Sequence, residues 1–142
     1  MTLAKNKMRL QVITPWGTKV DETVEMVIFR SVTGEMGILP RHEAYLCALD
    51  DAPLRILNDG SERRMAVLGG ICKVGDSVVT VLTDEAHWPE EIDKERMESL
   101  EEQIKEKLQE ETDEQEKKTH RAQLRRVQAK LDVSGFSPRS DL

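Results

Sequence analysis

The stretch Met8-Arg9-Leu10-Gln11-Val12 alternates strictly between apolar and polar side chains. A period of two is typical of a β-strand that buries one face. Similar alternation returns between Val24 and Ile28 and between Leu54 and Ile56, and the pattern continues to about Thr83. Turn sequences rich in Gly, Asn and Asp separate these stretches. We therefore predict an antiparallel β-sandwich of about eight short strands in this part of the chain.

A different pattern begins at Pro89. Proline suits the first position of a helix, and three acidic residues follow where the helix dipole is positive: Glu90, Glu91 and Asp93. We expect a helix from about Pro89 to Glu110. The sequence Thr112-Asp113-Glu114-Gln115 matches a capping box, which predicts a second helix to about Leu131. Because the break between them is short, the two helices should form an antiparallel hairpin.

The charged residues divide the chain at the same place. Of its 142 residues 48 are Lys, Arg, Asp or Glu; residues 1–88 hold 22 of these and residues 89–132 hold 24, more than half of that stretch. The first part can bury a core, whereas the second cannot do so alone. The expected organisation is a β-sandwich domain at 1–87, a two-helix hairpin at 88–133 and a flexible tail at 134–142.

Acidic and basic residues are separated within the hairpin. Residues 89–116 carry 13 acidic and 4 basic side chains, whereas residues 117–130 carry 6 basic and no acidic ones. We expect the hairpin to be marginally stable, to depend on docking and to have more than one arrangement. If released, the second helix would offer a basic face to an acidic partner. The alternative, a merely solvated helix surface, stays open on charge alone.

Composition excludes several classes of protein. The chain has no apolar run long enough to span a membrane and no secretory or transit signal in Met1–Leu10, so we expect a cytosolic protein. A net charge of −6 argues against nucleic-acid binding. Cys47 and Cys72 have no metal-ligand or redox spacing and are interpreted as small buried hydrophobes.

Motifs for catalysis are absent from the sequence, which contains no Walker A, GxGxxG, HExxH or GxSxG pattern. His42, His87 and His120 stand in separate contexts and are interpreted as surface or turn histidines, so no metal ligand and no catalytic residue is predicted. Taken alone, these observations favour a binding or regulatory protein.

Four segments are informative together: Gly34-Glu35-Met36-Gly37-Ile38-Leu39-Pro40-Arg41-His42, Leu68-Gly69-Gly70-Ile71, Val79-Thr80-Val81-Leu82-Thr83-Asp84-Glu85-Ala86 and Ile92-Asp93-Lys94-Glu95-Arg96. In this order, ahead of a charged helical hairpin, they closely resemble the epsilon subunit of bacterial F-type ATP synthases. The resemblance covers about residues 7–132. It implies an N-terminal sandwich of two five-stranded antiparallel sheets and a C-terminal two-helix domain.

The resemblance also implies a role in the central stalk, the rotor of the complex. Such a subunit binds the gamma subunit and the c-ring, couples ion flow to ATP synthesis and inhibits ATP hydrolysis when its helices extend toward the alpha and beta subunits of the catalytic head. It implies a peripheral place on the cytoplasmic face of the bacterial membrane, with membrane contact only through the complex. Whether protons or sodium ions move stays open.

Family positions imply two sets of contact residues. Glu35, Arg41 and His42 match the segment that faces the c-ring. The residues alone favour a plain turn for this segment, whereas the resemblance favours the c-ring contact. Four basic residues match positions that approach acidic segments of the head in the extended form: Arg121, Arg125, Arg126 and Lys130. We expect them to form an electrostatic latch.

Some family members bind ATP at the folded hairpin, and the resemblance implies four positions here: Asp93, Arg96, Arg126 and Lys130. Regulatory ATP is therefore a possible ligand. The chain departs from that pattern at Met97, at Lys130, where the family has a second Arg, and at His87, where ATP-binding members have an acidic residue. Lys lacks the bidentate fork of Arg, so phosphate binding would weaken. Asp93 and Arg96 are also interpretable as a pair that starts the first helix.

Two other classes compete with the rotor-subunit interpretation. A free-standing interaction protein with a β-sandwich and a coiled-coil tail fits the composition, and co-purification with a gamma-like subunit would separate the two. An enzyme is the weaker alternative, because no nucleophile and base can be paired from the sequence.

Overall fold

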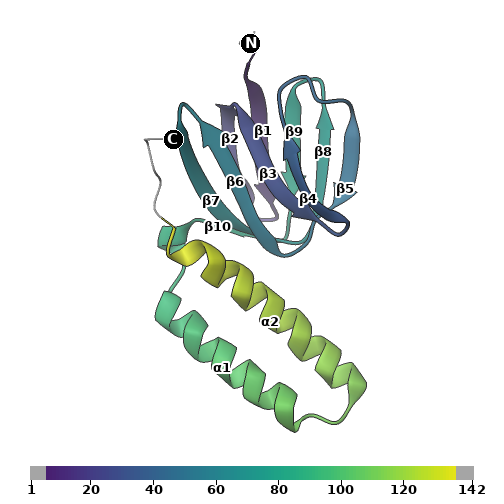
Figure 1. Cartoon of the computed structure of the whole chain (residues 1–142), viewed down its shortest axis with the longest axis vertical. Helices are drawn as coiled ribbons and strands as arrows, with labels where there is room; N and C mark the ends of the chain where they lie inside the picture. The colour runs from purple at the N-terminus through teal and green to yellow at the C-terminus, as the bar shows by residue number, and fades with distance from the viewer. Residues whose placement is uncertain (1–5, 137–142) are drawn as a thin grey trace.

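The computed structural model describes residues 6–136, which form two five-stranded sheets followed by two helices (Figure 1). The first sheet has the order β2 (Gly17–Val24), β1 (Met8–Thr14), β9 (Val78–Leu82), β8 (Ile71–Gly75), β5 (Tyr45–Ala48). The second has the order β10 (Glu85–His87), β7 (Ser61–Leu68), β6 (Ala52–Asn58), β3 (Met26–Ser31), β4 (Gly34–Ile38). The predicted sandwich of two five-stranded sheets, followed by a helical hairpin, is confirmed.

One strand pair is parallel, although the sequence predicts antiparallel sheets. In the first sheet β1 and β9 run parallel, from Arg9 opposite Val78 to Ile13 opposite Leu82, while the other strand pairs are antiparallel. Parallel neighbours need a long crossover connection. Most of the sandwich lies between these two strands in the sequence, so the connection is long enough.

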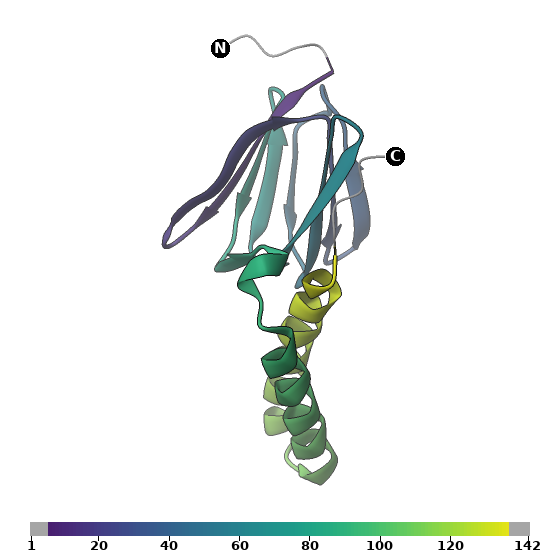
Figure 2. The ribbon, with the colours of Figure 1, turned by 90° about the vertical axis from the view of Figure 1, so that its left-hand side faces the viewer.

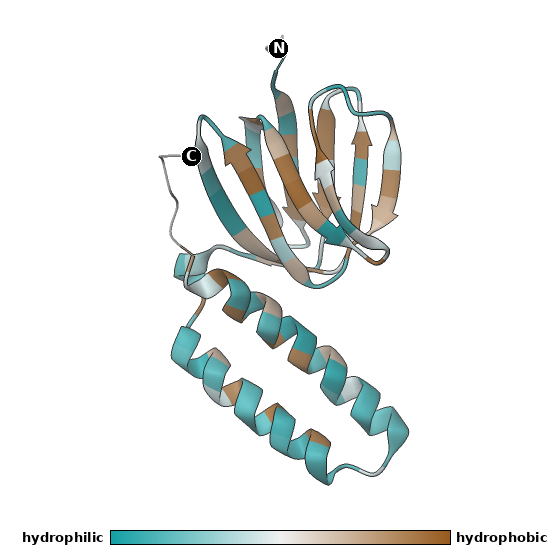
Figure 3. Cartoon of the chain, viewed as in Figure 1, coloured by the Kyte–Doolittle hydropathy of each residue, from teal (hydrophilic) through white to brown (hydrophobic). Residues whose placement is uncertain are grey.

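The core lies between the sheets and follows the alternation in the sequence. Met8, Leu10 and Val12 are at most 1% exposed, and they belong to one cluster with residues such as Val81 of β9 and Ile56 of β6. Figure 3 shows the resulting apolar bands on the strands. Burying alternate side chains on one face fixes the register of each strand.

Both cysteines lie on paired strands of the first sheet. Cys72 is buried and stands opposite the half-buried Cys47, and both thiols are free. Burial raises the pKa of the Cys72 thiol to about 12. The burial of Cys72 fits its interpretation as a small hydrophobe.

The first helix begins later than expected, so the prediction of a helix starting at Pro89 is wrong. Pro89–Glu91 form a single 3-10 turn, and α1 runs over Lys94–Glu110. The Glu91 carboxylate accepts the Trp88 N–H (2.9 Å), Ile92 is extended, and the Asp93 carboxylate accepts the Arg96 N–H (3.2 Å). Asp93 therefore starts a new helix as its N-cap.

The second helix also begins differently. Asp113, not Thr112, is the N-cap of α2 (Glu114–Ser134), because its carboxylate accepts the Gln115 N–H (3.3 Å). The predicted capping box is therefore wrong. α2 continues to Ser134, beyond the expected end at Leu131 and into the predicted tail, of which residues 137–142 lie outside the described part of the chain.

The hairpin extends from one end of the sandwich (Figures 1 and 2). Its α2 packs against β6 and β7, whereas α1 packs mainly against α2. Both helices are predominantly hydrophilic (Figure 3), and four of their residues are buried: Ile104, Val127, Ala129 and Val133. Among residues 6–136 no helix is both long and apolar enough to cross a membrane.

Candidate functional site at the hairpin junction

An apolar contact joins the end of α2 to the outer face of the second sheet. Ala66 and Leu68 alternate along β7 with the core residues Met65 and Val67, so they face away from the core, yet both are 0% exposed. Val133, near the end of α2, is also 0% exposed. Since α2 packs on β7, it covers this part of the sheet. Releasing the hairpin would expose this apolar surface to water.

Beside this contact lie three acidic residues, which we call the acidic edge: Asp51 just before β6, Asp84 just before β10, and Glu85, the first residue of β10. The Arg126 guanidinium reaches all three, with N–O distances of 3.8 Å to Asp51, 4.0 Å to Asp84 and 3.6 Å to Glu85. Lys130 Nζ lies 3.9 Å from Glu85. Because these distances are long and the groups are partly exposed, each pair contributes at most about 1 kcal/mol to the docking of α2 on the sandwich.

Burial and the neighbouring positive charges shift the carboxyl pKa values of the acidic edge in opposite directions. Burial raises the pKa of Glu85, but the hydrogen bond with His87 and the charges of Lys130 and Arg126 outweigh it, so the pKa lies below its ordinary value. For Asp51 burial outweighs the attraction of Arg126, and its pKa is raised. The docked helix thus stabilises the charged form of Glu85 and only partly compensates the burial of Asp51.

The structure divides the four predicted latch residues into two pairs. Arg126 and Lys130 contact the acidic edge, as described. Arg121 and Arg125 are exposed, and within residues 6–136 neither forms an ion pair at 4.0 Å or less. In the docked hairpin, therefore, two of the four cations are bound to the sandwich and two face solvent.

The four predicted ATP-binding residues lie in the half of the hairpin nearer the sandwich, but several already have partners. Asp93 caps α1 through its carboxylate, and Arg126 and Lys130 pair with Glu85. Arg96 is exposed. His87 Nε2 lies 3.1 Å from Glu85 Oε1. ATP binding stays a prediction, and a nucleotide would have to compete with these contacts.

The predicted c-ring residues lie within β4 and in the loop that follows it. Glu35 is the second residue of the strand, and its carboxylate lies 4.0 Å from Arg55. Arg41, exposed with φ of 66°, and His42 follow the strand, in the loop at the end of the sandwich away from the helices (Figure 1). Glu35 and Ile38 are separated by about 10 Å of strand. The three residues therefore do not form a single cluster.

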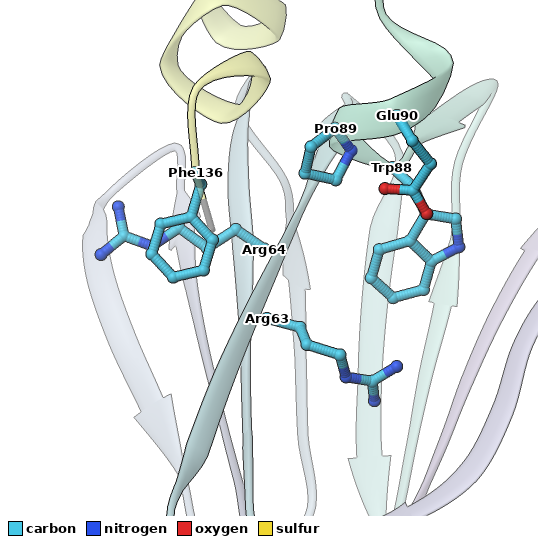
Figure 4. A pocket seen from close by; sticks show the side chains of 6 residues that line it. All are labelled: Arg63, Arg64, Trp88, Pro89, Glu90 and Phe136. Atoms are coloured by element: carbon cyan, nitrogen blue, oxygen red, sulfur yellow. The ribbon is translucent and has the colours of Figure 1, made fainter. Parts of the chain in front are cut away.

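A half-open cavity of about 360 Å³ lies near the junction (Figure 4). Its lining residues are Arg63, Arg64, Trp88, Pro89, Glu90 and Phe136. The Arg64 guanidinium carbon lies 4.4 Å from the ring centre of Phe136, just after α2, and that of Arg63 lies 5.2 Å from the ring centre of Trp88. These cation–π contacts add to the attachment of the hairpin at both of its ends.

Sequence reasoning missed the acidic edge and the stacked arginines. Asp51 is distant in the sequence from the adjacent residues Asp84 and Glu85, and only the folded second sheet brings all three within reach of Arg126. An available signal was the basic stretch of the second helix, which called for an acidic partner. The predicted latch places that partner in the catalytic head, whereas in the docked hairpin Arg126 and Lys130 contact acidic residues of the sandwich.

Comparisons with known proteins agree with this architecture. Residues 7–89 match the family described as "ATP synthase, Delta/Epsilon chain, beta-sandwich domain". The ATP synthase epsilon chain of Brevibacillus brevis is 38% identical over 130 residues, which cover 91% of this chain and 98% of the relative. That of Caldicellulosiruptor bescii is 31% identical over 128 residues, covering 90% and 93%.

A solved structure shares the fold over almost the whole chain. It is a chain of the Euglena gracilis mitochondrial ATP synthase, a structure that comprises OSCP, F1 and the c-ring. The match has a TM-score of 0.81 at 25% identity and covers 95% of this chain and 85% of the other. The chain described here therefore belongs to the family of ATP synthase epsilon chains, and residues 7–89 form its delta/epsilon β-sandwich domain.

Proposed function

We propose that this chain is the epsilon subunit in the central stalk of an F-type ATP synthase, where it couples ion translocation through the c-ring to ATP synthesis. It is a non-catalytic subunit that binds gamma and the c-ring through its sandwich. Its C-terminal helices inhibit ATP hydrolysis when they leave the sandwich for the alpha and beta subunits of the catalytic head. The complex holds it peripherally on the cytoplasmic face of the bacterial membrane.

The observation that carries the inhibitory part is the docking of α2 on the acidic edge. Arg126 and Lys130 are attached to the sandwich by long, partly exposed ion pairs. Such pairs are weak individually. An acidic surface elsewhere in the complex can compete for the same two cations, while Arg121 and Arg125 are already exposed to meet it. The hairpin is therefore suited to two alternative partners.

The docked hairpin and the inhibitory hairpin use different contacts, so variants can test the two states separately. The double variant Asp84→Asn, Glu85→Gln removes two charges that pair with Arg126 and Lys130 in the docked state. Weakening the docking by about 1 kcal/mol shifts the equilibrium roughly fivefold toward release. We expect the reconstituted complex to hydrolyse ATP more slowly with this variant, because more hairpins are free to inhibit.

The double variant Arg121→Glu, Arg125→Glu should act in the opposite direction. Neither residue forms an ion pair with the described part of the sandwich, although the charge of Arg125 also acts on Asp51, so docking should weaken less than the contact with the head. ATP hydrolysis should then be faster than with the wild-type chain. Lys118→Glu, on the same helix but outside the predicted latch, is the control. Unchanged hydrolysis with both double variants would overturn the inhibitory role.

The alternative interpretation, that the chain is a free-standing interaction protein, is tested separately. A rotor component should co-purify with gamma and the c-ring at a fixed stoichiometry, and its loss should reduce ATP synthesis coupled to ion flow. Recovery of the chain without gamma from membranes that contain intact synthase would favour the alternative.

A further inference from the structure

Three metal-ligating side chains meet at the turn between the two helices. Glu111 follows the last residue of α1, while Glu116 and His120 belong to the first turns of α2. One ligand atom from each residue, a carboxylate oxygen or a ring nitrogen, lies within 4.8 Å of the other two. In Figure 1 this turn is at the end of the hairpin away from the sandwich. It has no part in the docking described above.

Local structure holds two of the three ligands in place. The Glu111 Oε1 atom accepts the N–H groups of Thr112 (3.1 Å) and Asp113 (3.0 Å), which leaves its second oxygen for another partner. His120 Nδ1 lies 3.4 Å from the Oε1 atom of Gln123. The tautomer that donates from Nδ1 leaves Nε2 free, and metal-binding imidazoles usually donate their other nitrogen in this way.

The surroundings favour a cation. Glu111 and His120 are half-buried, and Glu116 is exposed. Three further acidic residues flank the ligands in the sequence: Glu110, Asp113 and Glu114. Of these, Glu114 pairs with Lys117 at 3.5 Å. Residues 107–121 hold five acidic and four basic side chains, so the turn keeps a small excess of negative charge, which favours a divalent ion at the three ligands.

We propose that Glu111, Glu116 and His120 bind a divalent transition metal of the zinc class, with water completing the coordination. Zinc bonds to imidazole nitrogen and carboxylate oxygen are about 2.0–2.2 Å long, which places neighbouring ligand atoms about 3–4 Å apart. The ligand atoms lie within 4.8 Å of one another in the structure, and rotation of the exposed Glu116 side chain brings its carboxylate closer to the other two ligands. A mixed nitrogen and oxygen ligand set favours zinc over calcium or magnesium, which take oxygen ligands.

The site exists only while the hairpin is bent. In one continuous helix Glu111 and Glu116, five residues apart, would point about 140° away from each other. Only the turn at Thr112 brings Glu111 onto the face that Glu116 and His120 share. Metal binding therefore stabilises the paired helices. If the proposed function holds, the metal also favours the docked hairpin over the extended one, and this consequence alone rests on that function.

Calorimetric titration of the full-length chain with Zn²⁺ tests the site. We expect one ion per chain, and Co²⁺ in its place should give a visible absorption spectrum with nitrogen and oxygen ligation. Loss of one ligand, in Glu111→Gln or His120→Ala, should weaken binding at least tenfold, since loss of an outer-shell partner already costs about 10–100-fold. Glu110→Gln and His42→Ala, matched in residue type, should bind like the wild type.

Two results would overturn the proposal: no zinc binding by the wild-type chain, or equal binding by the wild type and both ligand variants. Equal loss in Glu110→Gln would also overturn it, since that would indicate a diffuse acidic surface. Circular dichroism checks that each variant keeps its helices. If His120→Ala loses helical structure, His120→Asn replaces it as the ligand variant. Hydrogen exchange at residues 110–120 should slow with Zn²⁺ in the wild type and in the two controls, and it should not slow in the ligand variants. The ATP hydrolysis assays, run with Mg²⁺ and ATP but without zinc, test the proposed function independently.

Discussion

Gly70 lies where the chain passes closest to the end of β9. Its φ is +105°, and a Cβ there would stand 2.0 Å from the carbonyl oxygen of Leu82. Gly34 also has a positive φ, +136°, but a Cβ there would meet no atom within 4 Å. Both positions therefore favour glycine, and only Gly70 adds a collision with backbone.

The two glycines predict different losses of stability on substitution by alanine. Gly34→Ala should lower the free energy of unfolding by about 1–3 kcal/mol through backbone strain alone. Gly70→Ala should lower the free energy of unfolding clearly further, because the backbone of Leu82 must also move. Urea denaturation of both variants measures the difference. Equal losses would mean that the strand end shifts freely and that the close approach is not a constraint.

Glu62 is a buried carboxylate on the outer face of the second sheet. It is 5% exposed and accepts hydrogen bonds from Arg55 (2.7 Å and 3.2 Å) and Arg64 (2.5 Å). The hydrogen bond from Arg55, helped by Arg64, outweighs burial and holds the pKa of Glu62 below its ordinary value. A lowered pKa in the folded state means that the charged carboxylate stabilises the fold.

The sign of this shift predicts a pH dependence. The stabilisation should be complete above the ordinary carboxyl pKa of about 4.3 and should be lost as pH falls through the lower folded-state value. Glu62→Gln should cost about 1–3 kcal/mol at pH 7, and the difference from wild type should shrink toward pH 3. Thermal unfolding as a function of pH measures it. Glu43→Gln, which makes the same change at an exposed site, is the control.

Among the elements, α2 alone carries most of the contact between hairpin and sandwich. Val133, near its C-terminus, is fully buried, whereas Thr119, two turns into the helix, is exposed. A charge at Val133 would be buried without a partner if α2 stayed docked. The helix can avoid that cost by leaving the sheet, since the sandwich has a core of its own.

Val133→Asp should therefore release the hairpin without unfolding the sandwich. We expect protease cleavage within residues 89–136 to accelerate at least tenfold, while the sandwich fragment stays intact. Thr119→Asp introduces the same charge at an exposed position and should leave the cleavage rate near that of the wild type. Loss of the sandwich together with the hairpin would show that the two unfold as a single unit.

The elements also show what the sequence could predict. Strand alternation from Met8 onward predicted the sandwich, because a buried face requires a period of two. The helix starts were wrong at Pro89 and Thr112, since several acidic residues could cap and the choice of Asp93 and Asp113 depends on local backbone geometry. The acidic edge escaped prediction because Asp51 and Glu85 come within reach of the same arginine, Arg126, only after the second sheet has formed.

At the scale of the whole molecule, the sandwich and the hairpin differ in how they are stabilised. Every buried member of the main core cluster, from Met8 to Ala86, belongs to the sandwich. The hairpin buries four residues, and Val133 among them lies at the docked end of α2. The sandwich should therefore fold by itself, whereas the hairpin depends on the sandwich.

Two fragments test this dependence. A chain ending at Ile92 should retain a cooperative thermal transition, because its core is complete. A peptide of residues 89–136 should be predominantly unfolded at micromolar concentration, since helices of 17 and 21 residues with few buried side chains are marginal in water. Circular dichroism at 222 nm compares the peptide with the helical signal of the intact chain, and a dilution series excludes self-association. A peptide as helical as the intact hairpin would mean that the paired helices are stable once released. Undocking would then leave the hairpin folded, and the acidic edge would control only its position.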